Sequence, residues 1–302
     1  MNITGELKQY FHLHFIIVLL GFTAILGSII TLNAIELVWF RTFFASLGLW
    51  LYVRYRGVKV VLPVREQIHL YLIGLVVALH WITFFHAIKV SNVSITLGVF
   101  ASTTLFTSFL EPFLQKRPVL WIEVFIGMII LFGIYVIFQY ELQYSQGIIY
   151  SLISAFLNGL FVVLNRNISR KWHPSVISFY EMAGGFAFIS VFLLVTGQMA
   201  QPFVAFYLPD IFWILILSLV CTSYAFAAVV EIMKELSAYT VVLSINLEPV
   251  YGIILAFLFF GESEKMSSGF YFGTLIILGS VFAYPYLRRK FNKKRVSFPS
   301  DP

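Results

Sequence analysis

Long apolar runs alternate with short polar joints along the whole chain. A helix needs about 20 apolar residues to cross a bilayer, and ten segments of the chain meet this requirement. They cover residues 12–32, 35–53, 67–87, 92–114, 119–138, 147–165, 175–197, 210–233, 237–260 and 269–287. Polar and helix-breaking residues fill the joints, as in "RNISRKWHPS" and "GESEKMSSG". The pattern predicts an all-α polytopic membrane protein with ten transmembrane helices.

Composition points to the same class of protein. Hydrophobic residues make up 60% of the chain and charged residues 11%, compared with about 25% charged residues in soluble domains. The mean hydropathy is +0.91. The joints are too short for a domain outside the membrane, and the one cysteine, Cys221, excludes an intrachain disulfide. We therefore expect an integral protein of the plasma (inner) membrane, with the lipid bilayer as its main partner.

The distribution of Lys and Arg predicts the orientation. With the N-terminus in the cytoplasm, seventeen of these residues fall on the inner side and two, Lys89 and Lys265, on the outer side. Cytoplasmic joints carry the excess of basic residues, so both termini are expected inside. We interpret the basic tail "RRKFNKKRVSFPSDP" as the cytosolic flank of the last span and exclude a nucleic-acid partner.

The chain resembles itself at an offset near 145 residues. "HAIKVSNVSITL" aligns with "EIMKELSAYTVV", which places Lys89 on Lys234. "GMIILFG" aligns with "GTLIILG" at an offset of 146, and "FRTFFAS" aligns with "YEMAGGF" at 140, which places Arg41 on Glu181. Each half then holds five spans, so the second half enters the membrane from the opposite side. We predict two inverted five-helix repeats, residues 1–145 and 146–302, a construction that places transport sites near the midplane.

Four features together carry a family resemblance. They are Arg41 early in the second span, the junction "HAIKVSNVSI", "LEPVYG…LFFGE" in the ninth span, and "GxxxxxG" in the fifth and tenth spans. On these features the chain resembles the EamA-type transporters of the drug/metabolite transporter (DMT) superfamily, over about residues 10–290. The resemblance implies a ten-helix transporter of amino acids, drugs, nucleotide-linked compounds or other metabolites.

The two halves match the family pattern unequally. The second half keeps Lys234, Pro249, Gly261 and Glu262, whereas the first half has Thr104 in place of the proline and "KR" in place of Gly-Glu. The pair Glu111-Pro112 aligns with Glu248-Pro249 only at an offset of 137, which loses the lysine match, so we reject that alignment. Instead, Thr103 occupies the position that corresponds to Glu248.

Glu248 is the leading site candidate. Ionisable groups in the membrane interior are costly and are functional by default. On a continuous helix, Glu248 shares one face with Ser237, Ser244, Tyr251 and Gly252. Asn246 lies close by, and Pro249 frees carbonyl groups of the preceding turn. We expect a proton or cation site here; the alternative is a protonated glutamate that only holds the bundle together.

The other candidates lie in four further spans. His80 is central in the third span with Trp81, Phe84 and Phe85 around it, an aromatic lining that suits an organic solute; the alternative is a neutral core histidine with one hydrogen bond. Threonines including Thr103 form a matching stripe in the fourth span, and Asn158 is the best candidate of the sixth. Serine and threonine stripes also serve as contacts between helices.

Arg41 and Glu181 are expected about 9 Å inside their spans, from opposite sides of the membrane. We therefore predict that they do not pair, and that each holds backbone carbonyls or helix ends. For Arg41, binding of an anionic group is the alternative. Pro249, Arg41, Glu181, Lys89 and Lys234 form the expected structural set.

The leading functional hypothesis is a secondary transporter that exports metabolites, amino acids or drug-like solutes by alternating access. A proton or monovalent cation is the coupling ion if transport is coupled, and a homodimer is left open. An uncoupled facilitator or lipid-linked flippase is the first alternative. A membrane-embedded enzyme is remote, because the only aspartates are Asp210 and Asp301 and the histidines lack metal-ligand spacing. We expect no catalytic residues, metal or cofactor.

Overall fold

The computed structural model describes residues 3–116, 118–168, 171–204, 207–232 and 244–296, and every regular element in these ranges is helical. The long elements are α1 (Ile3–Ile29), α2 (Ala34–Tyr55), α3 (Val64–Val90), α4 (Val93–Phe100), α5 (Thr103–Gln115), α6 (Trp121–Tyr140), α7 (Ser145–Ile168), α8 (Pro174–Val195), α11 (Ala225–Ile232), α13 (Glu248–Phe260), α14 (Ser268–Val296) and the π-helix η2 (Ile216–Tyr224). The short ones are η1 (Leu142–Tyr144), α9 (Gln201–Val204), α10 (Asp210–Leu215) and η3 (Gly261–Glu264).

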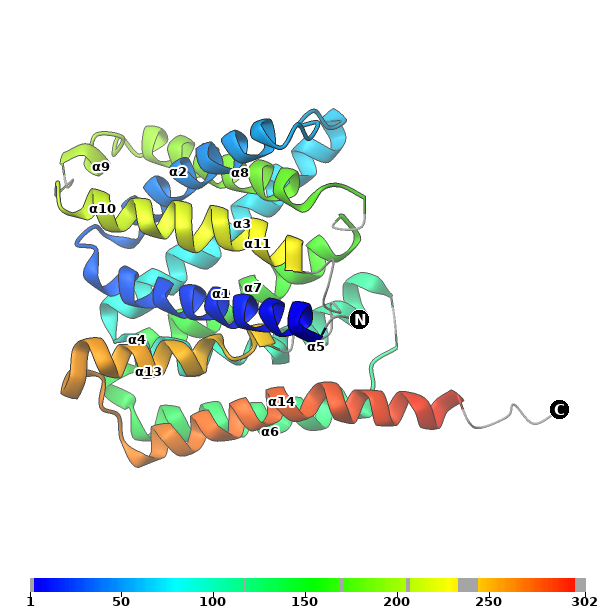
Figure 1. Cartoon of the computed structure of the whole chain (residues 1–302). Helices are drawn as coiled ribbons and strands as arrows, with labels where there is room; N and C mark the ends of the chain where they lie inside the picture. The colour runs from blue at the N-terminus through cyan, green and yellow to red at the C-terminus, as the bar shows by residue number, and fades with distance from the viewer. Residues whose placement is uncertain (1–2, 117, 169–170, 205–206, 233–243, 297–302) are drawn as a thin grey trace.

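Within the described residues, eight helices or helix series are long and apolar enough to cross a membrane, and they coincide with the first eight predicted spans. In the ninth predicted span, the described helix α13 has 13 residues. In the tenth, the apolar part of α14 covers Ser268–Tyr284. Both are shorter than the eight helices or helix series above. The chain runs back and forth along one bundle, and α1 begins at the end of the bundle where α14 finishes (Figure 1). Many large apolar side chains, such as Phe113 and Trp121, stay exposed on the outside, as expected for a surface in contact with lipid.

Local sequence signals set several helix ends. Asn33 accepts hydrogen bonds from the Ile35 and Glu36 amides, while the Glu36 carboxylate accepts one from the Asn33 amide. This capping box satisfies donors that the first turn of α2 leaves open. Gly57 and Gly197, with φ of 65° and 70°, follow the last residues of α2 and α8, where a left-handed residue ends a helix at low cost.

Helices of one half pack mainly against helices of the other half. α1 lies against α13, α7 against α5, α6 against α14, and α2 against both α8 and η2. Glycines allow the closest approaches: Gly21 faces Gly252 between α1 and α13, and Gly133 faces Gly273 between α6 and α14. The largest buried apolar cluster lies where α1, α2, α3, α8 and η2 meet, around the residues described next.

Candidate functional site

The ninth predicted span is interrupted directly before Glu248. Asn246 and Leu247 form a turn, Glu248 is the first residue of α13, and Pro249 is the second. Proline is stable in the first turn of a helix, where its missing N–H is not needed, so the interruption agrees with the helix-breaking character of Pro249. The turn also changes the helical phase, so Ser244 and Glu248 do not share one continuous helical face.

The fourth predicted span is interrupted at the corresponding place. α4 ends at Phe100, Ala101 and Ser102 form a turn, and α5 begins at Thr103. Both Thr103 and Glu248 are thus the first residues of a second helical segment, 145 positions apart. The hydroxyl of Thr103 donates to the Phe100 carbonyl at 2.8 Å. The Glu248 side chain is partly buried and has no hydrogen bond to any residue that the structure describes.

Arg41 of α2 is buried in the centre of the bundle, with 3% of its surface exposed. Its guanidinium stacks on the indole of Trp81 at 3.6 Å and lies 5.5 Å from the ring of Phe85. Nε donates to the hydroxyl of Thr222 at 3.1 Å. Nη1 is buried without a hydrogen-bond partner. The expectation that Arg41 holds backbone carbonyls is therefore wrong: an aromatic face and a hydroxyl hold it instead.

A π-helix presents Thr222 to Arg41. The hydroxyls of Thr222 and Ser223 donate to carbonyls five residues earlier, at Leu217 and Ser218. Ser223 also contacts the Ala45 carbonyl of α2. Because the Thr222 hydroxyl donates its hydrogen bond to the Leu217 carbonyl, its oxygen is oriented to accept a hydrogen bond from Arg41. π-Helical turns are frequent at functional sites, and the apolar pattern of the eighth span gives no signal for this one.

The charges of Arg41 and Glu248 are close enough to attract each other. They nevertheless form no direct ion pair in the described part of the chain. Arg41 also interacts electrostatically with His80, the neighbour of Trp81 on α3. The structure thus brings together Arg41, His80, Trp81 and Glu248, four residues that the sequence singled out separately.

His80 connects α3 to α7 through three hydrogen-bond contacts with Ser154, one of which joins Nδ1 to the Ser154 carbonyl at 3.1 Å. The Ser154 hydroxyl donates to the His80 carbonyl at 3.1 Å, and Nδ1 lies 2.8 Å from the same hydroxyl. Since that hydroxyl has already donated its proton, Nδ1 is assigned as the donor. The ring stacks on Phe100 with a centroid distance of 5.4 Å and an interplanar angle of 13°. This fixed orientation leaves Nε2 without a hydrogen bond to the described residues.

Comparison with known proteins adds the family. Residues 145–284 match the model of the EamA-like transporter family. The match confirms, for these residues, the resemblance predicted from the sequence. That family is part of the DMT superfamily and suggests a membrane transporter of small solutes. The long apolar helices likewise support an integral membrane protein.

A solved structure shares the fold over most of the chain. This crystal structure, described only as that of a protein, is 16% identical to this chain and covers 93% of this chain and 99% of its own length, with a TM-score of 0.64. At this identity the likeness shows the fold alone. No curated protein matches the sequence.

Two residues of the expected structural set, Glu181 and Lys89, connect neighbouring segments of the bundle. The Glu181 carboxylate accepts a hydrogen bond from the Asn165 amide at 2.6 Å and joins α7 to α8. Lys89 donates to the Ile30 carbonyl at 2.8 Å, just past the end of α1. No ion pair joins Arg41 and Glu181, both of which the structure describes.

The other predicted residues differ in what they contact. The Tyr251 hydroxyl is 2.9 Å from Nδ1 of His14, so it links α13 to α1. Asn158 on α7 is half-buried and has no hydrogen bond to the described residues, and Ser244 and Asn246 lie at the turn before α13. Lys234 lies outside the described residues. No group of three metal-ligating side chains occurs in the part of the chain that the structure describes.

A buried glutamate near the end of the ninth span was missed. The family pattern points to Glu262, but this residue is exposed and pairs with Lys265 at 3.2 Å. Glu264, which is 4% exposed, accepts hydrogen bonds from the Val93 and Ser94 amides at 3.1 and 2.8 Å. Its carboxylate therefore satisfies the first turn of α4 from the opposite half of the protein. Only the fold brings these segments together.

Proposed function

We propose that the protein is a secondary transporter that exports small organic solutes, such as metabolites, amino acids or drug-like compounds, across the plasma membrane by alternating access. The observation that carries this proposal is the pair of helix breaks before Thr103 and Glu248, the second of which lies within electrostatic reach of the buried Arg41. Transporters commonly bind solutes where discontinuous helices meet at the interface of two repeats. Export as the direction follows from the family resemblance.

The proposal includes ten spans in two inverted five-helix repeats, residues 1–145 and 146–302, with both termini in the cytoplasm. Helix boundaries support the repeat: α2 and α8 begin 140 residues apart, α3 and α10 begin 146 apart, and α5 and α13 begin 145 apart. The packing supports it as well, since α1 against α13 corresponds to α7 against α5 when the halves are exchanged.

Within this proposal, Glu248 couples solute movement to a proton or monovalent cation, and His80 orients the solute. Support for a coupling role comes from the position of Glu248 as the first residue of α13, within electrostatic reach of the buried Arg41. An uncoupled facilitator or a lipid-linked flippase would use the same fold with Glu248 uncharged throughout.

A metabolite screen of cells with and without the gene identifies the solute. The purified protein is then reconstituted into liposomes, and solute flux is followed with and without an imposed pH gradient. We expect the gradient to drive flux in the wild type and to have no effect in Glu248→Gln. Gradient-driven flux that survives this substitution would contradict the coupling role, and flux that is indifferent to the gradient in the wild type would favour the facilitator.

Topology has an independent test. Replacing Cys221, the single cysteine of the chain, by alanine gives a background without thiols, to which one cysteine is added at Ser300 or at Lys265. A membrane-impermeant thiol reagent applied to intact cells should label position 265 and not position 300. Labelling of both positions in intact cells would contradict the ten-span arrangement.

A further inference from the structure

Arg41 has more hydrogen-bond donors than the protein satisfies. A guanidinium has five N–H groups in one plane. Among the described residues only Nε has an acceptor, the Thr222 hydroxyl at 3.1 Å. A carboxylate can bind two N–H groups of a guanidinium through parallel hydrogen bonds, and Nη1 is a buried donor of this kind that has no partner among these residues.

The groups nearest to Arg41 do not provide a partner for Nη1. Glu248 attracts Arg41 from a distance but makes no contact with it. The Thr222 hydroxyl accepts from Nε and donates to Leu217. Trp81 and Phe85 offer only ring faces. A buried charge without paired hydrogen bonds is strongly unfavourable, so a position of this kind points to a partner that arrives from outside.

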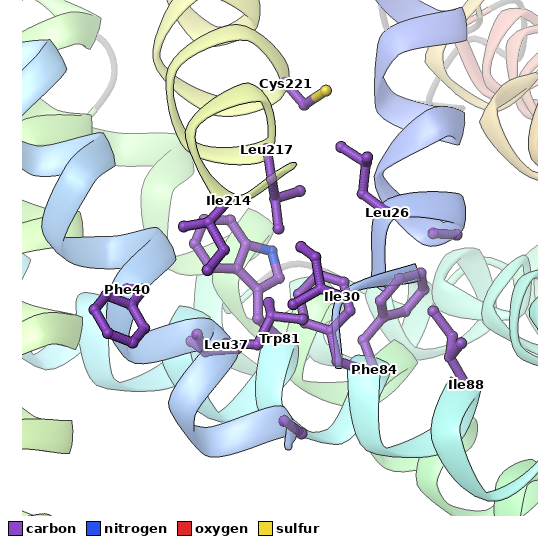
Figure 2. Close-up of a cluster of buried hydrophobic side chains, with 14 of the residues drawn as sticks. Leu26, Ile30, Leu37, Phe40, Trp81, Phe84, Ile88, Ile214, Leu217 and Cys221 are labelled. Atoms are coloured by element: carbon purple, nitrogen blue, oxygen red, sulfur yellow. The ribbon is translucent and has the colours of Figure 1, made fainter. Parts of the chain in front are cut away.

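Packing holds the guanidinium in one orientation. Figure 2 shows Trp81 among apolar side chains from other segments, including Ile30, Ile214 and Leu217, which belong to the same buried cluster. The indole covers one face of the guanidinium, and Thr222 occupies one edge. A site with its orientation fixed in advance binds a planar ligand with little loss of conformational entropy.

We infer that Arg41, held by Trp81 and Thr222, is a subsite for the carboxylate group of the solute. The inference rests on the proposed function only in taking Arg41 to lie on the solute's path. Arg41 is the only buried Lys or Arg among the described side chains. One positive charge matches a group with a single negative charge, such as a carboxylate, better than a phosphate that carries two.

Equilibrium binding to the full-length protein in detergent tests the subsite. The probes are acetate, lactate and benzoate, each compared by calorimetric titration with its neutral amide at matched ionic strength. We expect at least one carboxylate to bind about tenfold more tightly than its amide, a difference of about 1.4 kcal/mol. Phenyl phosphate, with two negative charges, should bind more weakly than benzoate.

Substitutions assign the preference to Arg41. Arg41→Lys keeps the positive charge but loses bidentate hydrogen bonding and the stacking of the planar guanidinium on Trp81. The preference for carboxylate over amide should therefore fall to about twofold or less. Arg54→Lys is the matched control, because Arg54 is an exposed arginine of the same helix above Trp50 at 5.9 Å. If Arg41→Lys does not fold, Thr222→Val takes its place: it removes the acceptor that orients Nε and should also reduce the preference.

The inference is overturned if no carboxylate exceeds its amide in the wild type, or if the preference survives both site substitutions. Tighter binding of phenyl phosphate than of benzoate would overturn the carboxylate class. Binding requires no movement across the membrane, so the binding test and the transport test can fail independently. If the protein binds a carboxylate at Arg41 but moves no solute in liposomes, the inferred subsite stands and the proposed transport function is contradicted.

Discussion

The two interrupted spans share their backbone and differ in their chemistry. In the fourth span α5 begins at Thr103, and in the ninth α13 begins at Glu248, each after a two-residue turn. The Thr103 hydroxyl donates a hydrogen bond to the Phe100 carbonyl, three residues earlier in the same span. Glu248 has no such bond to the described residues and lies within electrostatic reach of Arg41. The break therefore belongs to the architecture of both halves, whereas the charge belongs to one half only.

The largest expected effect is a difference in solute flux between a substitution at Glu248 and one at Thr103. Glu248→Gln removes the acidic group that attracts the buried Arg41 and leaves that arginine without an opposite charge nearby, which is unfavourable in the bundle interior. We expect flux of the identified solute in liposomes to fall about 100-fold, about 2.7 kcal/mol in the barrier. Thr103→Val loses one hydroxyl bond to backbone, worth about 1 kcal/mol, and should retain most of the flux.

Both variants need to remain folded for this comparison, which size-exclusion chromatography and thermal unfolding in detergent would establish. Equal losses of flux in the two variants would mean that the charge at position 248 carries no special role. In that case the break itself, and not its first residue, would be the functional feature.

A second comparison concerns the glycines that bring the halves together. A Cβ on Gly21 would lie 2.9 Å from the Gly252 nitrogen and 3.3 Å from the Glu248 carbonyl oxygen, both backbone atoms. A Cβ on Gly159 would lie 3.1 Å from the Thr107 hydroxyl, 3.2 Å from the Thr107 nitrogen and 3.3 Å from the Phe106 Cβ. None of these contacts is as short as the 2.9 Å contact of Gly21. Overpacking costs about 1–3 kcal/mol, against a gain of about 1 kcal/mol in helix propensity.

We therefore expect Gly21→Ala to destabilise the protein by about 1–2 kcal/mol and Gly159→Ala to change stability by less than about 1 kcal/mol. Thermal unfolding in detergent measures both. A larger loss for Gly159→Ala would show that the contact between α7 and α5 is the tighter of the two.

Some of this site could be predicted from the sequence because it depends on local signals. Apolar length located the first eight spans, and the cost of an intramembrane charge singled out Glu248 and Arg41. The partners of Arg41 could not be predicted, since Trp81 lies 40 residues away and Thr222 is oriented by a π-helix that no periodicity encodes. Likewise, nothing near Glu264 indicates that it binds the amides of Val93 and Ser94, about 170 residues earlier.

The smallest effect tests why the fourth span breaks without a proline. Thr104 corresponds to Pro249, and each is the second residue of its helix. Proline at such a position removes a donor that has no partner within the helix, and the Glu248-Pro249 pair shows that the preceding residue tolerates it. We expect Thr104→Pro to keep unfolding stability within about 1 kcal/mol of the wild type. Ser108→Pro, in the interior of α5, should cost about 3 kcal/mol or more. If Thr104→Pro destabilises the protein as much as Ser108→Pro in the same detergent unfolding assay, then position 104 needs its N–H and the two breaks are not equivalent.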